Sequence, residues 1–455
     1  MPDQIQSPVS YYAPWEKKFG RILTPFEEFV HRETALGVVL IFCTISALVL
    51  ANSPLAAAYD HLLHTHIVFS IGAFTVDHTL HHWINDGLMA FFFFLVGLEI
   101  KREVLEGDLS NFKVATLPII AAAGGMLVPA LIYAAFNYGS PTADAWGIPM
   151  ATDIAFALGV LALLGDRVPK ALFTFLVALA IVDDLGAVAV IAIFYTETIA
   201  IGPLGLAGVC LSVLILFNLG GVRSPIPYFI VAVVLWFAML ESGIHATIAG
   251  VLGAMTIPIH PKVKPEDFSE HIRRLLDKFD ALDEGSRTLL NSAQQRAIVQ
   301  AVESGIHKVE SPLQRLEHSL HLPVAFFIVP VFALANAGVP IDFAGLGETL
   351  TQPVTLGIGL GLIVGKLIGV AGFTLIAAKL GLGQLPHGCR SAHIVGVALL
   401  AGIGFTMSIF IAELAFRNDP PEFLLAAKTG ILFASLIAGS LGYIALRLAW
   451  RPRSD

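Results

Sequence analysis

Charged residues are scarce in this chain. Asp, Glu, Lys and Arg make up only 14% of the 455 residues, whereas 56% are hydrophobic. A soluble protein of this size carries about 25% charged residues, so the composition excludes an ordinary soluble fold. Apolar runs of about 20 residues recur along the chain, and each is long enough to cross a bilayer as a helix. The sequence therefore predicts an all-α, polytopic membrane protein.

Cysteine and net charge are also low. The three cysteines, Cys43, Cys210 and Cys389, lie in or beside apolar segments without metal-ligand spacing, so we expect them to pack as small apolar side chains. The net charge of −8 is modest and gives no indication of nucleic-acid binding. No cleavable signal is evident, because the first apolar run follows 34 residues of mixed charge.

Twelve apolar runs are present, and the basic residues between them predict their orientation. The runs start near residues 35, 84, 115, 145, 169, 201, 226, 243, 321, 353, 392 and 424. Of 27 Lys and Arg residues, 24 lie at the termini or in alternate loops, and the exceptions are Lys366, Arg417 and Lys428. Basic loops stay in the cytoplasm, so we expect both termini there.

This orientation divides the chain into three parts. Residues 1–34 form a cytoplasmic N-terminal segment, and residues 451–455 form a cytoplasmic tail. Residues 35–450 form a single transmembrane domain, into which the cytoplasmic loop 260–320 is inserted.

Segments 3–5 and 10–12 run in opposite directions across the membrane, so they are candidates for two inverted-topology repeats. The middle segment of each trio is interrupted. The helix-weakening residues are Gly147 and Pro149 in segment 4, and Gly396, Gly402 and Gly404 in segment 11. Paired interruptions in corresponding positions indicate a transporter binding site. The alternative is that membrane helices simply tolerate Gly and Pro.

Four charged residues lie inside the spans: Asp153, Asp183, Asp184 and Lys366. Each ionised side chain at the bilayer centre costs roughly 2.5–3.5 kcal/mol, so these residues are expensive unless an ion, a proton or a counter-charge needs them. Asp183 and Lys366 both lie about 20 Å into their spans, near the midplane. Lys366 follows a four-residue stripe of glycines at 357, 361, 365 and 369, which favours close approach of a neighbouring helix.

Asp183 and Asp184 cannot both face one partner, because adjacent helix positions point about 100° apart. We assign Asp184 to a hydrated cation and Asp183 to Lys366. Na⁺ takes oxygen ligands, and Thr152, Asp153 and the unwound backbone beside them supply such oxygens. A carboxylate that holds either a proton or a cation, but not both, exchanges the two by competition. If more than one proton moves per cation, the exchange is electrogenic.

Six strings in this order resemble the NhaA-type sodium/proton antiporters over nearly the whole chain. They are ATDIAFALGVLALLG (151–165), VDDLGA (182–187), ESGIHATIAGVLGA (241–254), FALANAGV (332–339), VGKLIG (364–369) and GIGFTMSIFIAELAF (402–416). The resemblance implies that Asp184 and Asp183 bind the ion and that Lys366 pairs with Asp183. It places Asp153, beside Thr152, where two broken helices cross.

The resemblance also implies activation at alkaline pH through a cytoplasmic cluster. The matching residues are Glu99, Lys101, Arg102, Glu103, Glu317, His318 and His321. Glu317 and His321 are one helical turn apart at the inner mouth, where histidine titrates near working pH. Simple surface solvation is the alternative. Asp86 matches an acid at the outer end of segment 2, or caps that helix. His245 matches a histidine that tunes the pH profile, or is a packing residue.

Two loops depart from the familiar pattern. The inner loop 260–320 is long, polar and helix-permissive, and it is either a neutral insertion, a modifier of the pH response or a partner site. The outer loop contains His61, His64, His66, His78, His81 and His82, which are solvated or, alternatively, bind a metal. In relatives this loop forms a β-hairpin, so we expect a homodimer through residues 60–82.

The function that follows is exchange of cytoplasmic Na⁺ or Li⁺ for external protons across a bacterial inner membrane, for sodium and pH homeostasis. This protein is then no enzyme, needs no cofactor, binds no nucleic acid, and has membrane lipid as its surroundings. An intramembrane aspartyl protease is disfavoured because the two aspartates are contiguous and GIGF lacks the acid of GxGD. An ion channel does not need a midplane lysine. A cation-coupled symporter would need a larger polar pocket.

Overall fold

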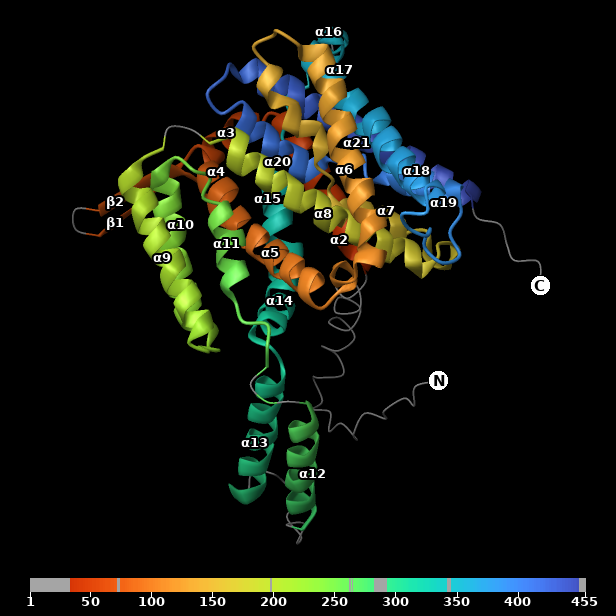
Figure 1. The fold of residues 1–455 in the computed structure, drawn as a ribbon. Coiled ribbons are helices and arrows are strands. Elements are labelled where there is room, and N and C mark those ends of the chain that lie inside the picture. The colour runs from red at the N-terminus through yellow and green to blue at the C-terminus, as the bar shows by residue number, and fades with distance from the viewer. Residues whose placement is uncertain are drawn as a thin grey trace, which may run out of the picture.

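The computed structural model describes residues 33–71, 74–196, 199–261, 263, 265–281, 293–341 and 345–449. Almost all of the proposed N-terminal segment, 1–34, and the whole tail, 451–455, lie outside this range. Within it the chain forms a bundle of helices with one small hairpin, as Figure 1 shows.

The first half of the bundle comprises α2 (Glu33–Ala51), α3 (Ala56–Leu63), α4 (Leu80–His82), η1 (Trp83–Leu88), α5 (Met89–Leu105), η2 (Asp108–Ser110), α6 (Phe112–Asn137), η3 (Ala143–Met150), α7 (Ile154–Ala162), η4 (Gly165–Arg167), α8 (Lys170–Phe194), α9 (Ile201–Leu219), α10 (Pro225–Ser242) and α11 (Ile248–Thr256). The 3₁₀ helix η3 and the π-helix η1 interrupt otherwise α-helical spans.

The second half comprises α12 (Pro265–Ala281), α13 (Ala293–Val309), α14 (Pro312–Pro323), η6 (Val324–Ile328), α15 (Val329–Asn336), α16 (Leu346–Thr351), α17 (Pro353–Leu360), η7 (Gly361–Gly365), η8 (Leu367–Gly372), α18 (Phe373–Lys379), α19 (Ser391–Leu400), α20 (Phe405–Ala415) and α21 (Pro421–Ala449). Here η6, η7 and η8 are π-helical turns.

Nine helices in the described part of the chain are long and apolar enough to cross a membrane. Two bent pairs, α2 with α3 and α19 with α20, bring the number to at most eleven. The eighth predicted span is shorter than expected, because the chain bends at 243–247 before α11, which has only nine residues. The all-α polytopic architecture is therefore confirmed, whereas the count of twelve spans and the inverted repeats stay predictions.

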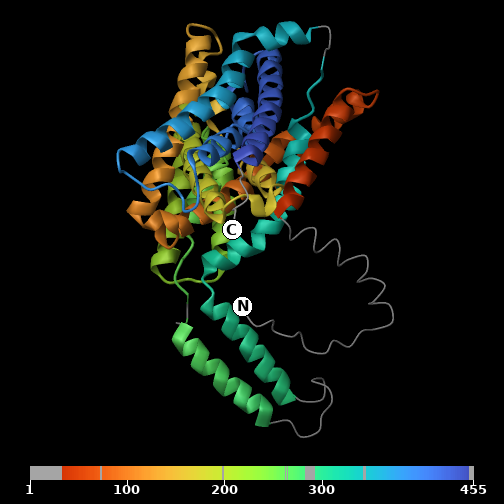
Figure 2. The same ribbon diagram turned by 90° about the vertical axis from the view of Figure 1, so that its right-hand side faces the viewer.

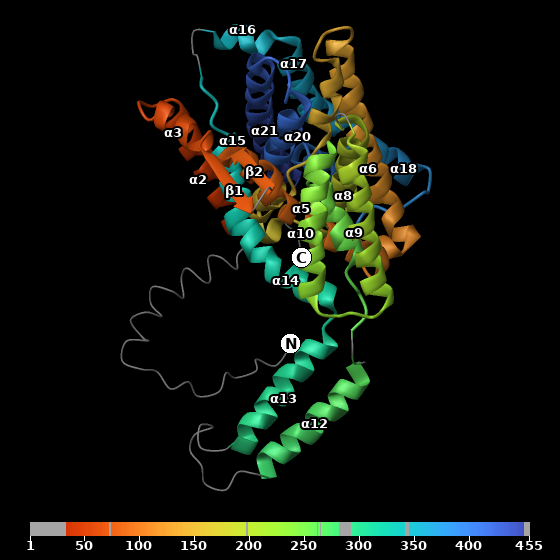
Figure 3. The ribbon, with the colours of Figure 1, turned by 90° about the vertical axis from the view of Figure 1, so that its left-hand side faces the viewer.

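Two hydrophobic cores hold the bundle together. The larger core joins residues from α2 through α8 with residues from α15 through α21. The smaller core is formed mainly by α9, α10 and α11 against Leu98 of α5 and Leu313 of α14. Figure 3 shows α9 and α10 side by side at the flank of the bundle. The charged midplane residues all come from the larger core region.

The glycine stripe of segment 10 brings α17, η7 and η8 against α6, as predicted. A Cβ at Gly365 would lie 2.8 Å from the Cα of Pro129, and a Cβ at Gly369 would overlap the backbone of Gly124. Only glycine therefore allows these two helices to pack backbone against backbone. This contact fixes the helix that carries Lys366.

The outer loop contains the expected hairpin. Strand β1 (His66–Ile71) pairs antiparallel with β2 (Phe74–Thr79), in a register that sets His66 opposite Thr79 and Ile71 opposite Phe74. Thr79 then caps α4, accepting a hydrogen bond from the backbone N–H of His82. The hairpin is thereby joined directly to the helical span that begins at α4.

The long loop between α11 and α14 contains two further helices. Figures 1 and 2 show α12 and α13 projecting from the bundle as a pair, and they contact each other. Their polar, helix-permissive sequence therefore forms helices, as expected. Because they extend away from the midplane residues, they do not position the candidate site.

Candidate functional site

The two predicted interruptions meet in the structure. Residues 151–153 separate η3 from α7, and residues 401–404 separate α19 from α20. Asp153 N–H donates a hydrogen bond to the Ile403 carbonyl at 2.6 Å, and Thr152 Oγ1 donates to the Ala401 carbonyl at 2.8 Å. The broken stretches thus satisfy part of each other's backbone, which is the condition for non-helical chain inside a membrane protein.

Asp153 lies at the N-termini of two half-helices. Its Oδ1 accepts a hydrogen bond from Phe156 N–H at 2.9 Å and so caps α7. Its Oδ2 accepts from Thr406 N–H at 3.0 Å and from Thr406 Oγ1 at 2.5 Å, which caps the start of α20. A negative charge between two positive helix ends is favourable. Asp153 therefore holds the two broken spans together at one point.

Thr406 is a further site residue, which the sequence shows only within the string 402–416 beside the interruption. Its side chain is buried, and both of its hydrogen bonds to Asp153 join residues 253 positions apart in the chain. Gly402 and Gly404 mark the break that precedes it. The sequence does not show which carboxylate it meets, since that depends on how the spans cross.

Gly402 and Gly404 on one broken span, and Gly361 opposite Pro149 of the other, allow η7 to approach the crossing closely. A Cβ at Gly404 would lie 2.9 Å from Leu362 Cδ2, and one at Gly402 would overlap the Leu362 carbonyl. A Cβ added at Gly361 would lie only 2.8 Å from the Cβ of Pro149, on the other broken span. The helix-weakening residues therefore create space as well as breaking the helices.

Asp183 and Lys366 form the ion pair that the sequence predicted. Lys366 Nζ donates to Asp183 Oδ2 at 2.7 Å, and the side chains are 0% and 1% exposed. Lys366 is the single residue between the π-turns η7 and η8, and wide turns of this kind occur often at functional sites. The second oxygen of Asp183, Oδ1, is buried and has no hydrogen-bond partner among the described residues.

Asp184 is the midplane carboxylate without a protein partner. It is 3% exposed on α8, and its side chain makes no hydrogen bond or ion pair with any residue in the described ranges. Asp183, Asp153, Glu99 and Lys366 lie within electrostatic range of it. A buried carboxylate that nothing in the protein satisfies is costly, so a proton or a bound cation would have to satisfy it.

The predicted cytoplasmic cluster is only partly assembled. Arg102 Nε donates to both oxygens of Glu317 at 3.0 and 3.1 Å, while its Nη1 lies 2.8 Å from Glu103 Oε1. This links α5 to α14. Lys101 Nζ instead donates to the carbonyls of Met255 and Ile257, at the end of α11.

The remaining members of that cluster are less tightly held. Glu99 is half-buried on α5, one turn before Glu103, and Glu317 and Glu103 lie within electrostatic range of it. His318 and His321 are exposed, and neither forms a hydrogen bond or ion pair with another described residue. On α14, Glu317 faces Arg102 of α5.

Asp86 and His245 lie near the hairpin end of the bundle. Asp86 is buried within η1 and does not cap a helix; its Oδ2 lies 3.2 Å from His82 Nδ1 and 3.9 Å from Arg417 Nη2. His245 is buried between α10 and α11, and its Nε2 contacts the Tyr195 carbonyl. Both residues, with His78, His82 and Arg417, line a cavity of about 460 Å³.

No set of three or more His, Cys, Asp or Glu side chains suited to a metal ion occurs in the part of the chain that the structure describes. In the outer loop, His66 instead pairs with Asp77 at 2.6 Å and His64 pairs with Asp60 at 3.2 Å. These pairs give the metal alternative no support. All three cysteines are free; Cys210 is buried, and Cys43 and Cys389 are half-buried.

Comparison with known proteins identifies the family. The family model described as Na⁺/H⁺ antiporter 1 matches residues 27–446. The chain belongs to this antiporter family. It is 54% identical to the Na⁺/H⁺ antiporter NhaA of Sulfurimonas denitrificans, over 96% of this chain and 98% of that protein. It is 53% identical to NhaA 1 of Saccharophagus degradans, over 94% of this chain and 92% of that protein.

A third antiporter named NhaA, from Dichelobacter nodosus, is 48% identical over 96% of this chain and 94% of that protein. Such coverage includes every span and both interruptions described above. The resemblance inferred from the six strings is therefore confirmed, and the chain is a multi-pass membrane protein of the NhaA family.

Proposed function

We propose that this protein exchanges cytoplasmic Na⁺ or Li⁺ for external protons across a bacterial inner membrane, for sodium and pH homeostasis. The observation that carries the proposal is the state of the two aspartates. Asp183 is neutralised by Lys366, whereas Asp184, next to it, is buried without a partner. The carboxylate of Asp184 is thus left to bind a transported ion.

The oxygens around the crossing complete a hard-cation site. Asp184 supplies the charge, and Asp153, Thr152 and the carbonyls of the broken stretches are oxygen ligands of the type that Na⁺ prefers. No cofactor takes part. When protons occupy the carboxylates, the cation is excluded, and the two ions therefore alternate at one site.

The Lys366–Asp183 pair gives a reason for electrogenic exchange. Asp183 Oδ1 is buried and unpaired, so Asp183 can ligate the cation only if its bond with Lys366 weakens. Binding one cation would then release a proton from Asp184 and a second from the Lys366–Asp183 pair. Two protons for each Na⁺ move net charge across the membrane, and current-free exchange by the purified protein in liposomes would contradict this.

We further propose that the termini are cytoplasmic and that activation at alkaline pH acts through the Glu103–Arg102–Glu317 link between α5 and α14. The charge distribution supports the orientation, since 24 of the 27 basic residues fit it. His318, His321 and His245 belong to the same regulatory proposal. Two copies would associate through the hairpin, whose two strands pair only with each other in the described chain and leave their outer edges open.

The test is ΔpH dequenching in everted vesicles, with NaCl, LiCl or KCl added over a series of pH values. Wild type should respond to Na⁺ or Li⁺ and not to K⁺, and Asp184→Asn should not respond to any of them. Asp419→Asn is the matched control, because Asp419 is an exposed aspartate after α20. A wild-type protein without a response at any pH would overturn the proposed function.

A further inference from the structure

Arg417 and Lys428 are the two basic residues that break the charge rule at the hairpin end, and each is held by a buried carboxylate. Lys428 Nζ lies 2.5 Å from Glu413 Oε1, and both side chains are 13% exposed. Arg417 Nη2 lies 3.9 Å from Asp86 Oδ2. The proposed orientation places both pairs on the outer face.

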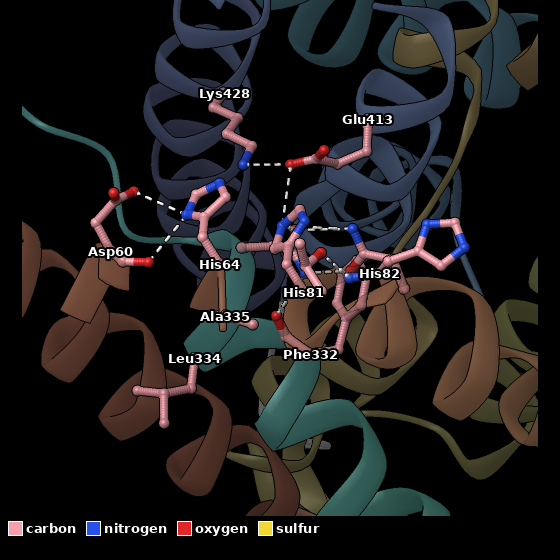
Figure 4. Close-up of polar contacts among 12 residues, drawn as sticks. Asp60, His64, His81, His82, Phe332, Leu334, Ala335, Glu413 and Lys428 are labelled. Carbon is pink, nitrogen blue, oxygen red and sulfur yellow. Dashed lines mark hydrogen bonds and ion pairs between the residues drawn. The ribbon is translucent and has the colours of Figure 1, made fainter. Parts of the chain in front are cut away.

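A histidine reaches the same carboxylate oxygen as the cation in both pairs. His81 Nε2 lies 3.7 Å from Glu413 Oε1, and His82 Nδ1 lies 3.2 Å from Asp86 Oδ2. Figure 4 shows Lys428 and His81 approaching Glu413 from different sides. A protonated histidine would therefore compete with a permanent cation for one carboxylate oxygen. The group formed by Glu413, Lys428 and His81 is the clearer case, because all three side chains are half-buried.

The hydrogen bonds around His81 indicate where a proton binds. Asn336 Nδ2 donates to Asn85 Oδ1 at 2.8 Å, which turns Asn336 Oδ1 toward His81 Nε2 at 2.9 Å. An amide oxygen only accepts, so Nε2 carries the hydrogen in the neutral ring. The other nitrogen, Nδ1, is then the basic one. His81 is thus held in the tautomer that can take up a proton at Nδ1.

We propose that His81, Glu413 and Lys428 form a proton-binding site on the outer face that controls the position of α20. This inference rests on the proposed function and orientation. In the neutral state one carboxylate balances one ammonium. A proton on His81 adds a second cation beside Glu413 Oε1, and this weakens the tie between α20 and α21.

Other ionisable groups around the site modulate the same balance. The ring of His64 is stacked at 6.4 Å from that of His81, and Asp60 lies 3.2 Å from His64. On the other side, His82 follows His81 directly and lies 3.2 Å from Arg417. Each of these neighbouring histidines has a carboxylate of its own, Asp60 beside His64 and Asp86 beside His82.

The half-helix α20 connects this site to the midplane. Thr406 and Glu413 are seven residues apart, which places them on one face of α20 and about 10 Å apart along its axis. Between them, Phe410 is fully buried against Phe93 and Phe332. This aromatic cluster interrupts any polar route along that face, so the proton acts through movement of the helix. When Glu413 is released, the far end of α20 shifts the Thr406 bond to Asp153.

The experiment measures Na⁺ efflux from right-side-out vesicles that contain the full-length protein, with the interior held alkaline and external pH lowered from about 8 to about 5.5. Each variant rate is divided by the wild-type rate, because the ratio removes the changing driving force. His81→Gln keeps an N–H donor for Asn336 but cannot be protonated. The ratio of the His81→Gln rate to the wild-type rate should stay near one at alkaline external pH. It should fall several-fold as external pH is lowered through the range in which histidine is protonated.

If protonation of His81 accelerates Na⁺ efflux, wild type has a midpoint for this acceleration on the external-pH axis. Two further variants should move that midpoint in opposite directions. Lys428→Met leaves Glu413 free to stabilise a protonated His81, so the midpoint rises by about 0.5–1 pH unit. Glu413→Gln leaves Lys428 to repel that proton, so the midpoint falls by a similar amount. The double variant, which removes both charges, guards against a folding defect and should lie between them.

His61→Gln is the matched control, because His61 is an exposed histidine on α3. If His81→Gln, Lys428→Met and Glu413→Gln all exchange with the external-pH profile of wild type and of this control, the inference is overturned while the proposed function stands. Wild type without Na⁺-dependent efflux would overturn the proposed function itself.

Discussion

Two lysine–carboxylate pairs in the described part of the chain, one buried and one half-buried, have different surroundings. Lys366 and Asp183 are 0% and 1% exposed and lie beside the unpartnered carboxylate of Asp184. Lys428 and Glu413 are each 13% exposed and lie beside His81, at the end of the same broken span that meets Asp153. We therefore propose that the neighbour, rather than the pair, decides the role of each site: a transported ion beside Lys366 and Asp183, and a regulatory proton beside Lys428 and Glu413.

The largest effect should come from breaking the midplane pair. Lys366→Met leaves the Asp183 charge buried without a partner, so we expect a loss of about 3–5 kcal/mol in the free energy of unfolding. Thermal unfolding of the purified protein in detergent measures this loss. The control is Lys366→Met combined with Asp183→Asn, which removes both charges and should recover most of the stability. Equal stability of the single and double variants would contradict the pairing.

Thr406→Val tests the crossing that both pairs share through α20. The substitution keeps the shape of the side chain and removes the hydroxyl that donates to Asp153 Oδ2. A hydrogen bond to a charged group contributes about 1.5–3 kcal/mol, so the apparent KM for Na⁺ should rise by about ten- to one-hundred-fold. The control is Thr406→Ser, which retains the hydroxyl and should stay close to wild type. An unchanged KM for valine would remove Thr406 from the site.

Lys428→Met tests whether the outer pair is the weaker of the two. Glu413 would be left without its 2.5 Å partner, although His81 and the partial exposure of the site reduce the cost. The expected loss is about 1–3 kcal/mol, which is smaller than that for Lys366→Met under the same conditions. A loss as large as that of Lys366→Met would show that burial and neighbours do not separate the two pairs.

Glu317→Gln should have the smallest effect on stability and a visible effect on regulation. Glu317 is 18% exposed and Arg102 is 35% exposed, so water screens their bond and the expected loss is about 0–1 kcal/mol. If this bond is part of the pH response, the activity profile of everted vesicles should shift along the pH axis. Glu310→Gln, on the same loop before α14, is the control. An unshifted profile would exclude Glu317 from regulation.

The sequence predicted the architecture from simple quantities. Long apolar runs predicted helices, the glycine stripe predicted the close approach of a neighbouring helix, which is α6, and the resemblance implied the hairpin. The run near residue 243 was misjudged as a full span, because hydropathy does not register the bend that shortens it to α11. The capping alternative for Asp86 has no support, since Asp86 lies inside η1 and its partners are the side chains of His82 and Arg417.

At the site, residue types and depth pointed to Asp153, Asp183, Asp184 and Lys366, because a charge inside a bilayer is too costly to lack a purpose. Equal depth made Lys366 a candidate partner of the aspartate pair, and the resemblance implied that Asp183 is the one that meets it. The sequence did not predict Thr406 as the partner of Asp153, nor His81 and Lys428 as partners of Glu413. The Thr406–Asp153 and His81–Glu413 contacts join spans far apart in the chain, and the Lys428–Glu413 contact depends on how α20 and α21 pack.

The sequence by itself thus determined which segments enter the membrane and which charges enter with them, since both depend on local apolarity and length. Only the tertiary structure decided that Lys428 pairs with Glu413, that Thr406 meets Asp153, and that Asp184 has no partner among the described residues. The physical reason is that an ion pair depends on distances of a few ångströms, and these are set by how broken helices cross and pack.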